Sequence, residues 1–387
     1  MVKAFCSLIA LFLFVNDTVA NDIKSLNPIE ELVIKVPHFK EAMSFNVTLP
    51  NGYSEHPNKK YFVLFDLHPR SQPFLAGTQD WLSHNGEWPW LQTIIVNPAN
   101  YHQEFATLFE ETAKNPKSNK MLEVFEQHIM KQIANNYRTN GFNIYSGFMS
   151  NGAIGLYLLA HKPNLFNAYL LATPTLADNF LSLETEFEKR VASLTDKKRF
   201  LYITIGDHAY EKAHRAGVDY IHQVLEKRAP KYLSWEVDDT RENYYMTRPV
   251  MTVLNGIEKL FDDYHQSLAP DSSISRQGAR AIIEYYKELS DLKYGFPVSA
   301  EQSLKRLAKM KLLNEPQAAL SIYEKVMKLY PESAYAYSDA AAAYKNQGNI
   351  VKAISLQKTA VEKAKKMSVW HQNNHKKILK QLEEQVN

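Results

Sequence analysis

Cysteine is almost absent from this sequence of 387 residues, which contains a single one, Cys6. The chain has a basic residue at Lys3, an apolar run from Ala4 to Val15 and the small residues Thr18-Val19-Ala20. A basic start, a short apolar segment and a small-residue cleavage site are typical of a secretory signal peptide. We therefore expect residues 1–20 to be removed and the protein to be exported, either to the periplasm or out of the cell. The mature chain would then have no thiol for a disulfide, a nucleophile or a metal site.

Long hydrophobic runs and an excess of one charge are also missing. The run from Ala4 to Val15 is shorter than the roughly 20 residues of a membrane-spanning helix, so no stable membrane insertion is expected after cleavage. The 45 basic and 42 acidic residues leave a net charge of +3 and are scattered along the chain. This balance argues against a nucleic-acid partner. With 45% apolar and 12% aromatic residues, the chain has the composition of a globular protein.

Residues 21–270 alternate strand-like and helix-like segments. Helical patterns such as 121–135 and 216–227 separate apolar runs that predict strands, and several of these runs lack the alternation of a half-exposed strand. The predicted strands are 32–36, 44–49, 61–67, 93–97, 143–146, 168–172 and 200–206. Strands that alternate with helices predict a mainly parallel sheet with helices on both sides, which is an α/β fold.

Only helical patterns follow Pro270. Residues 271–299 predict a linking helix, and beyond residue 300 similar residues recur with a period of about 34. The recurring positions pair Ala319 with Ala353, and small and aromatic residues mark the first helix of the second unit: Tyr337, Ala340, Ala341, Tyr344 and Gly348. This pattern resembles tetratricopeptide repeats at 300–333 and 334–367, followed by a capping helix at 368–387. Stacked helix pairs form concave surfaces, so the resemblance implies an all-α helical-repeat module that binds a protein partner.

Residues 143–159 predict a strand, a tight glycine turn and a helix. This is the order of elements in a nucleophile elbow, where a strained turn projects a nucleophile and helix N–H groups stabilise an oxyanion. The segment resembles the esterase branch of the α/β hydrolases, which includes siderophore esterases and S-formylglutathione hydrolases. Residues 136–139, 161–166 and 173–176 also resemble landmarks of that family, and the resemblance covers residues 34–261. It implies an α/β-hydrolase fold for residues 21–270.

Two departures from the family pattern affect the catalytic triad. Gly147 and Gly152 align with the glycines of the elbow, so Met149 occupies the nucleophile position, and a thioether is no acyl-transfer nucleophile. Ser150 is the alternative nucleophile, but that register places Phe148 where the elbow needs a small side chain. The other interpretation of Ser150 is that it caps the following helix.

The histidine of the family aligns with Asn243, and an asparagine cannot accept and return a proton. Asp207 follows a predicted strand and resembles the triad carboxylate, with helix capping as its other interpretation and Glu211 as a second candidate acid. The remaining histidines of this region are expected to lie on the surface or on helices, with substitution for the missing base as the alternative: His208, His214 and His222.

Leu67 and His68 follow a predicted central strand, where the family places its second oxyanion donor, a backbone N–H. The His68 side chain is expected either to line the pocket or to lie in a loop. His371 and His375 share a helix face, but no third ligand completes a metal site. Phosphate-loop, dinucleotide-binding and His-Glu-x-x-His motifs are absent from the sequence, so neither a cofactor nor a metal is expected.

The sequence therefore predicts an exported, esterase-like protein with a degenerate triad, whose pocket binds a small ester, peptide or glycan-like ligand. One alternative is an active serine esterase that uses Ser150 as its nucleophile. The other is a structural scaffold that presents the helical repeats to a protein partner.

Overall fold

The protein is represented by a computed structural model that describes residues 28–84 and 90–385. The predicted signal peptide, residues 1–20, lies outside the described residues. The chain divides into two compact units. The first consists of residues up to 194 together with 200–258, and the second of residues 195–199 together with 259–387.

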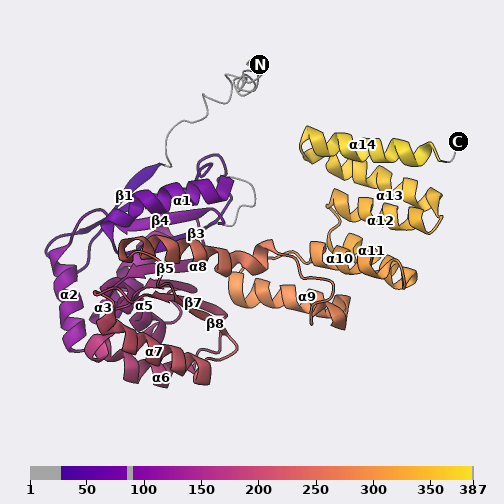
Figure 1. The fold of residues 1–387 in the computed structure, drawn as a ribbon. Helices are drawn as coiled ribbons and strands as arrows, with labels where there is room; N and C mark the ends of the chain where they lie inside the picture. The colour runs from indigo at the N-terminus through magenta and orange to yellow at the C-terminus, as the bar shows by residue number, and fades with distance from the viewer. Residues whose placement is uncertain (1–27, 85–89, 386–387) are drawn as a thin grey trace, which may run out of the picture. The chain divides into compact units, whose positions relative to one another are not determined.

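The first unit is built on an eight-stranded sheet with the order β1-β2-β4-β3-β5-β6-β7-β8 (Figure 1). The pairs β1–β2 and β2–β4 are antiparallel, whereas β4–β3, β3–β5, β5–β6 and β6–β7 are parallel. The strands are β1 (Ile29–Ile34), β2 (Met43–Thr48), β3 (Tyr61–Asp66), β4 (Thr93–Pro98), β5 (Thr139–Phe148), β6 (Ala168–Ala172), β7 (Arg199–Ile205) and β8 (Leu233–Asp239). The predicted α/β fold with a mainly parallel sheet is confirmed.

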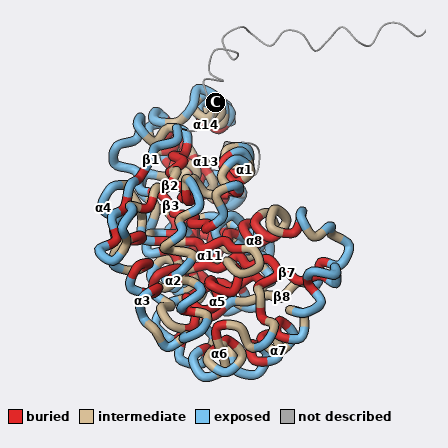
Figure 2. Tube along the Cα trace, turned by 90° about the vertical axis from the view of Figure 1, so that its left-hand side faces the viewer, coloured by how far each residue is buried: buried red, intermediate tan, exposed pale blue. Residues whose placement is uncertain are grey.

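Unbroken apolar runs explain the central strands. Every residue of β3, β4, β6 and β7 is buried, as expected for strands covered on both faces. Figure 2 shows buried positions concentrated in the strands and α5, with exposed positions on the outer helices. β8 is not among the predicted strands, because its sequence Leu-Ser-Trp-Glu-Val-Asp-Asp is half polar and most of the strand is only partly buried.

Helices cover this sheet. They are α1 (Gln72–His84), α2 (Gln103–Lys114), α3 (Lys120–Glu123), α4 (Lys131–Asn136), α5 (Ser150–His161), α6 (Leu183–Val191), α7 (Lys212–Arg228) and α8 (Arg248–His265). A π-helical stretch at Val124–Met130 joins α3 to α4, so the helix predicted at 121–135 is continuous with both. α5 is buried at nearly every position, because it packs directly against β5 and β6.

The second unit is helical. Its helices are α9 (Ala279–Glu288), α10 (Glu301–Lys311), α11 (Pro316–Leu329), α12 (Ala334–Asn346), α13 (Ile350–Lys363) and α14 (Val369–Glu383). From α10 onward each helix packs against the next. Buried alanines such as Ala341, Ala353 and Ala360 allow this close approach. The predicted C-terminal helical region is therefore present.

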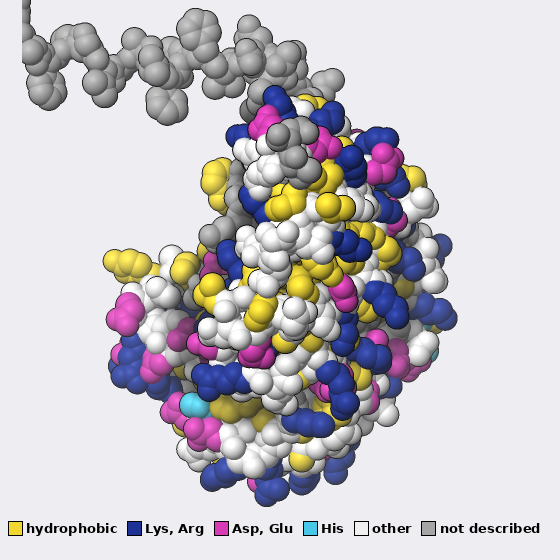
Figure 3. All heavy atoms as spheres, turned by 90° about the vertical axis from the view of Figure 1, so that its right-hand side faces the viewer, with side chains coloured by type: hydrophobic (Ala, Val, Ile, Leu, Met, Phe, Trp, Pro, Cys, Tyr) yellow, Lys and Arg dark blue, Asp and Glu magenta, His cyan; other side chains and the backbone are white. Residues whose placement is uncertain are grey.

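Surface side chains of both charges are interspersed on the face drawn in Figure 3, and hydrophobic side chains gather along the middle of that face. Among the large hydrophobic residues that the second unit exposes are Leu313, Val351, Val369 and Trp370. No helix within residues 28–84 and 90–385 is long and apolar enough to span a membrane.

Candidate functional site

Met149 lies at the apex of the turn between β5 and α5. Its backbone has φ 54° and ψ −119°, a region that a residue with a Cβ atom rarely adopts and that persists only where its surroundings fix it. The Met149 N–H donates to the carbonyl of Ala172 at the end of β6 (3.0 Å), and its carbonyl accepts from Thr175 N–H (3.1 Å). The strained position of the elbow is thus residue 149, held by the neighbouring strand.

The residues around Met149 fit the same geometry. A Cβ atom on Gly147 would lie 2.5 Å from the carbonyl oxygen of Asn151, so only glycine is accommodated there. Ser150 is the first residue of α5 and not its cap, which corrects the capping interpretation. Within the described ranges, its hydroxyl makes no hydrogen bond to a histidine or any other residue.

Glu211 is the carboxylate that the loop after β7 buries; its exposed fraction is 0%. Its Oε1 accepts from the Thr173 hydroxyl (2.6 Å) and forms an ion pair with Arg248 Nε (2.6 Å), while Oε2 accepts from Arg248 Nη2 (3.0 Å). Asp207 is exposed and makes no hydrogen bond in the described part of the chain, so it neither caps a helix nor orients a base. The buried acid of this site is Glu211.

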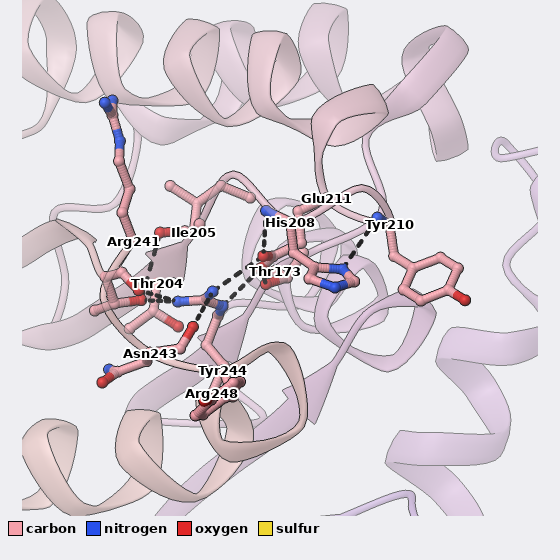
Figure 4. Close-up of polar contacts among 12 residues, drawn as sticks. Thr173, Thr204, Ile205, His208, Tyr210, Glu211, Arg241, Asn243, Tyr244 and Arg248 are labelled. Carbon is pink, nitrogen blue, oxygen red and sulfur yellow. Dashed lines mark hydrogen bonds and ion pairs between the residues drawn. The ribbon is translucent and has the colours of Figure 1, made fainter.

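The Arg248 guanidinium is 1% exposed and lies between Glu211 and the loop after β8 (Figure 4). Its Nη1 donates to the carbonyl of Thr240 (2.6 Å) and to the Thr240 hydroxyl, and Nη2 donates to the carbonyl of Asn243 (3.2 Å). A Cβ atom on Gly206 would overlap the guanidinium. Because arginine stays protonated in proteins, this partner of the buried acid cannot accept a proton.

Asn243 contributes its backbone carbonyl to this cluster, and its side-chain amide points away from Arg248 (Figure 4). Residues 240–247, which include the loop after β8, contain no histidine. The His208 ring stacks on Tyr245 with centroids 5.4 Å apart, and Tyr245 in turn contacts Phe148 at 5.1 Å. His208 and Phe148 thus contact the same aromatic ring, and no hydrogen bond joins His208 to Ser150 among the described residues.

His214 and His222 lie on α7. His214 Nδ1 accepts from Ala177 N–H (3.3 Å), and burial lowers the pKa of His214. The His222 ring packs edge-on against Trp235 at 5.4 Å. Neither histidine is hydrogen-bonded to Ser150 in the described part of the chain.

Asp66 forms a second buried polar cluster at the end of β3. Its Oδ1 accepts from His68 N–H (2.8 Å) and the Ser71 hydroxyl (2.8 Å), and its Oδ2 accepts from the Ser146 hydroxyl (2.7 Å). Burial raises the pKa of the Asp66 carboxyl group. The His68 N–H is therefore engaged inside the protein and does not face an oxyanion.

A pocket of about 310 Å³ borders the elbow. Leu67 and His68 line it on one side, and Asn151 and Ile154 of α5 on another. The segment between β4 and the first turns of α2 supplies much of the remaining wall. The His68 side chain thus both belongs to a loop and lines the pocket.

His371 and His375 lie on α14, away from these residues in sequence. The His371 ring is hydrogen-bonded to the Tyr335 hydroxyl (2.7 Å), and His375 is fully buried. In the described ranges, no group of three or more His, Cys, Asp or Glu side chains could hold a metal ion.

Comparison with solved structures identifies the fold of this chain. No protein-family model and no curated protein matches the chain. An IroE-like serine hydrolase from Shewanella oneidensis matches with a TM-score of 0.56 and 20% identity, over 78% of this chain and 100% of that one. The BES protein from Bacillus cereus matches with a TM-score of 0.52 and 16% identity, over 59% and 93%. This chain has an α/β-hydrolase fold.

The fold likeness extends beyond the α/β unit. An uncharacterised protein from Capnocytophaga ochracea matches with a TM-score of 0.68 and 13% identity, over 92% of this chain and 99% of that one. A match of that extent includes helices of the second unit. At these identities the likeness is one of fold, so the chemistry has to be argued from the residues of the site.

The roles of two residues of the site were not predicted from the sequence. Arg248 begins α8 directly after the loop where the family pattern has its histidine, and an arginine at that place does not by itself indicate a buried ion pair. Asp66 is a charged residue at the end of an otherwise apolar strand, a position that predicts a carboxylate that is either hydrogen-bonded inside the protein or functional. Their partners are distant in sequence, so the clusters themselves required the fold.

Proposed function

We propose that this protein binds a ligand at an esterase-like site that no longer hydrolyses it. The proposal rests above all on Met149, which occupies the strained apex where an α/β hydrolase holds its nucleophile. A thioether cannot form an acyl intermediate, because it has no proton to lose and gives no stable ester. The apex therefore offers no group that could form a covalent bond to a substrate.

The surroundings of Met149 support the same proposal. Glu211 is paired with Arg248, and no histidine ring in the described part of the chain is hydrogen-bonded to its carboxylate. In a working triad, loss of the nucleophile or base costs about 10⁶ in turnover, and the members act as one unit. Once the nucleophile has been replaced, replacement of the base costs little further. Met149 at the apex and a Glu211 paired with Arg248 are consistent with the loss of both the nucleophile and the base.

The remaining parts of the proposal concern location and partners. The sequence of residues 1–20 supports export, and we assign 300–333 and 334–367 to tetratricopeptide-like repeats. The spacing of the helices supports this assignment, since α12 and α13 begin about one repeat length after α10 and α11. The ligand is expected to be a small ester, peptide or glycan-like molecule, and the repeats are expected to bind a protein partner.

A fluorophosphonate probe tests the proposal. The protein without residues 1–20 is incubated with the probe, and its intact mass is recorded beside that of Ser150→Ala. We expect no adduct on either protein, because no histidine in the described ranges is hydrogen-bonded to Ser150. A stoichiometric adduct that disappears in Ser150→Ala would establish the active-esterase alternative and refute the proposal.

A further inference from the structure

We propose that the pocket beside the elbow accepts an uncharged aromatic group that bears an amide or ester carbonyl. We call it the aryl pocket and define it by its lining: Met43, Leu67, His68, Pro69, Pro98, Asn100, Tyr101, His102, Phe105, Ala106, Phe109, Asn151 and Ile154. Asn151 and Ile154 of α5 place this pocket beside the elbow, and its lining includes neither Met149 nor Ser150. The inference therefore goes beyond the proposed function, because it assigns a ligand class to a pocket next to the apex.

The lining excludes a charged ligand group. It contains no aspartate, glutamate, lysine or arginine. A carboxylate or ammonium group that entered would lose its hydration without meeting an opposite charge, which is costly. Phe105, Phe109 and Tyr101 instead offer aromatic surface, which favours a planar ring in offset or edge-on contact.

The volume of the aryl pocket limits the size of its occupant. A cavity of about 150 Å³ is enough for benzene. The aryl pocket holds about 310 Å³, which leaves room for one ring and a small substituent. A longer chain or a second sugar-sized ring would have to extend outside it.

His102 is fixed as part of the wall. Its Nδ1 accepts from Phe105 N–H (3.2 Å), and its Nε2 lies 3.2 Å from the carbonyl oxygen of Glu41. The neutral ring therefore carries its hydrogen on Nε2 and donates it to that carbonyl. The ring also stacks on Phe39 at 5.2 Å. With both nitrogens engaged, His102 presents its ring surface to a ligand and no donor.

His68 differs from His102 in the hydrogen bonding of its Nε2. Its Nδ1 accepts from Arg70 N–H (3.2 Å), so the neutral ring carries its hydrogen on Nε2. No acceptor among the described residues is hydrogen-bonded to that Nε2. The side chain is exposed and lines the aryl pocket, so it provides a hydrogen-bond donor beside an apolar wall. A carbonyl oxygen on the bound ring is the complementary group.

A matched pair of fluorinated probes tests the ligand class. Binding of 4-fluorobenzamide and of 4-fluorobenzoate to the whole protein is measured by ¹⁹F NMR titration. The two probes have the same ring and differ in charge. We expect the amide to bind at least about tenfold more tightly than the carboxylate. Equal binding, or tighter binding of the carboxylate, would overturn the inference.

Variants locate the binding. Ala106→Trp should fill the aryl pocket and abolish binding of 4-fluorobenzamide, whereas Thr107→Trp, on an exposed position of the same helix, should leave it unchanged. Tyr101→Ala removes an exposed wall residue without touching the core and should weaken binding several-fold. Binding that survives both Ala106→Trp and Tyr101→Ala would place the probe elsewhere and overturn the inference.

His68→Phe separates the donor from the aromatic wall. The variant should weaken the binding of 4-fluorobenzamide about tenfold, as expected for one lost hydrogen bond, and leave the binding of fluorobenzene unchanged. An equal loss for both probes would show that His68 acts only as surface, and would refute its role as donor. These outcomes are independent of the fluorophosphonate result, which tests the absence of hydrolysis and not the occupancy of the aryl pocket.

Discussion

The buried pair of Glu211 and Arg248 allows a quantitative prediction. In Arg248→Met the Glu211 carboxylate keeps the Thr173 hydroxyl and loses its counter-charge in a fully buried position. Breaking a buried ion pair by removing one partner costs about 3–5 kcal/mol in the free energy of unfolding. The double variant Glu211→Gln/Arg248→Met removes both charges while the glutamine can still accept from Thr173. We expect it to be at least about 2 kcal/mol more stable than Arg248→Met alone.

Urea denaturation followed by circular dichroism measures these differences, using the transition that includes the α/β unit. Arg215→Met is the matched control, because Arg215 pairs with the partly exposed Asp239. An exposed pair contributes about 0–1 kcal/mol, so Arg215→Met should have a small effect. If Arg248→Met costs no more than Arg215→Met, or if the double variant is no more stable than Arg248→Met, the pair does not hold this site together.

Three further changes test other parts of the structure. Met149→Ser alone should leave hydrolysis of 4-nitrophenyl acetate close to the buffer rate, because within the described residues no histidine ring is hydrogen-bonded to Glu211. Strong activity would show that a base has been overlooked. Gly206→Ala should lower the free energy of unfolding by about 3 kcal/mol, because its Cβ overlaps Arg248, whereas Gly77→Ala, with no atom nearby, should stabilise by up to about 1 kcal/mol. Burial lowers the pKa of His161 from 6.5 to about 4, so the folded protein favours the neutral ring and the free energy of unfolding should fall as the pH drops from 6.5 toward 4. The melting temperature of His161→Leu should not show that decline. An unchanged decline would show that another group titrates.

The sequence predicted those parts of the fold that leave a local signal. Unbroken apolar runs identified β3 and β4, and the glycine spacing identified the turn at Met149. β8 was missed because a strand that is only partly buried needs few apolar residues.

The site was harder to predict than the fold. Arg248 and Glu211 are 37 residues apart, and the Asp66 carboxylate meets Ser146 across 80 residues. Nothing local to either residue specifies such a partner, because the contact exists only once neighbouring strand ends have been brought to the same edge of the sheet. The sequence could therefore indicate which positions depart from the triad pattern of the family it resembles, and not which side chains meet there in the fold.

The segment 195–199 belongs to the helical unit although it runs into β7, whose first residue is Arg199. Within that unit, Lys198 N–H donates to the carbonyl of Leu292 (2.8 Å), and its side chain pairs with Glu288 (3.4 Å). A gene fragment that ended at residue 258 would leave this stretch without those partners, immediately ahead of a central strand. Recombination would therefore exchange the helical unit less freely than a simple C-terminal appendage, and the two units are expected to be inherited together.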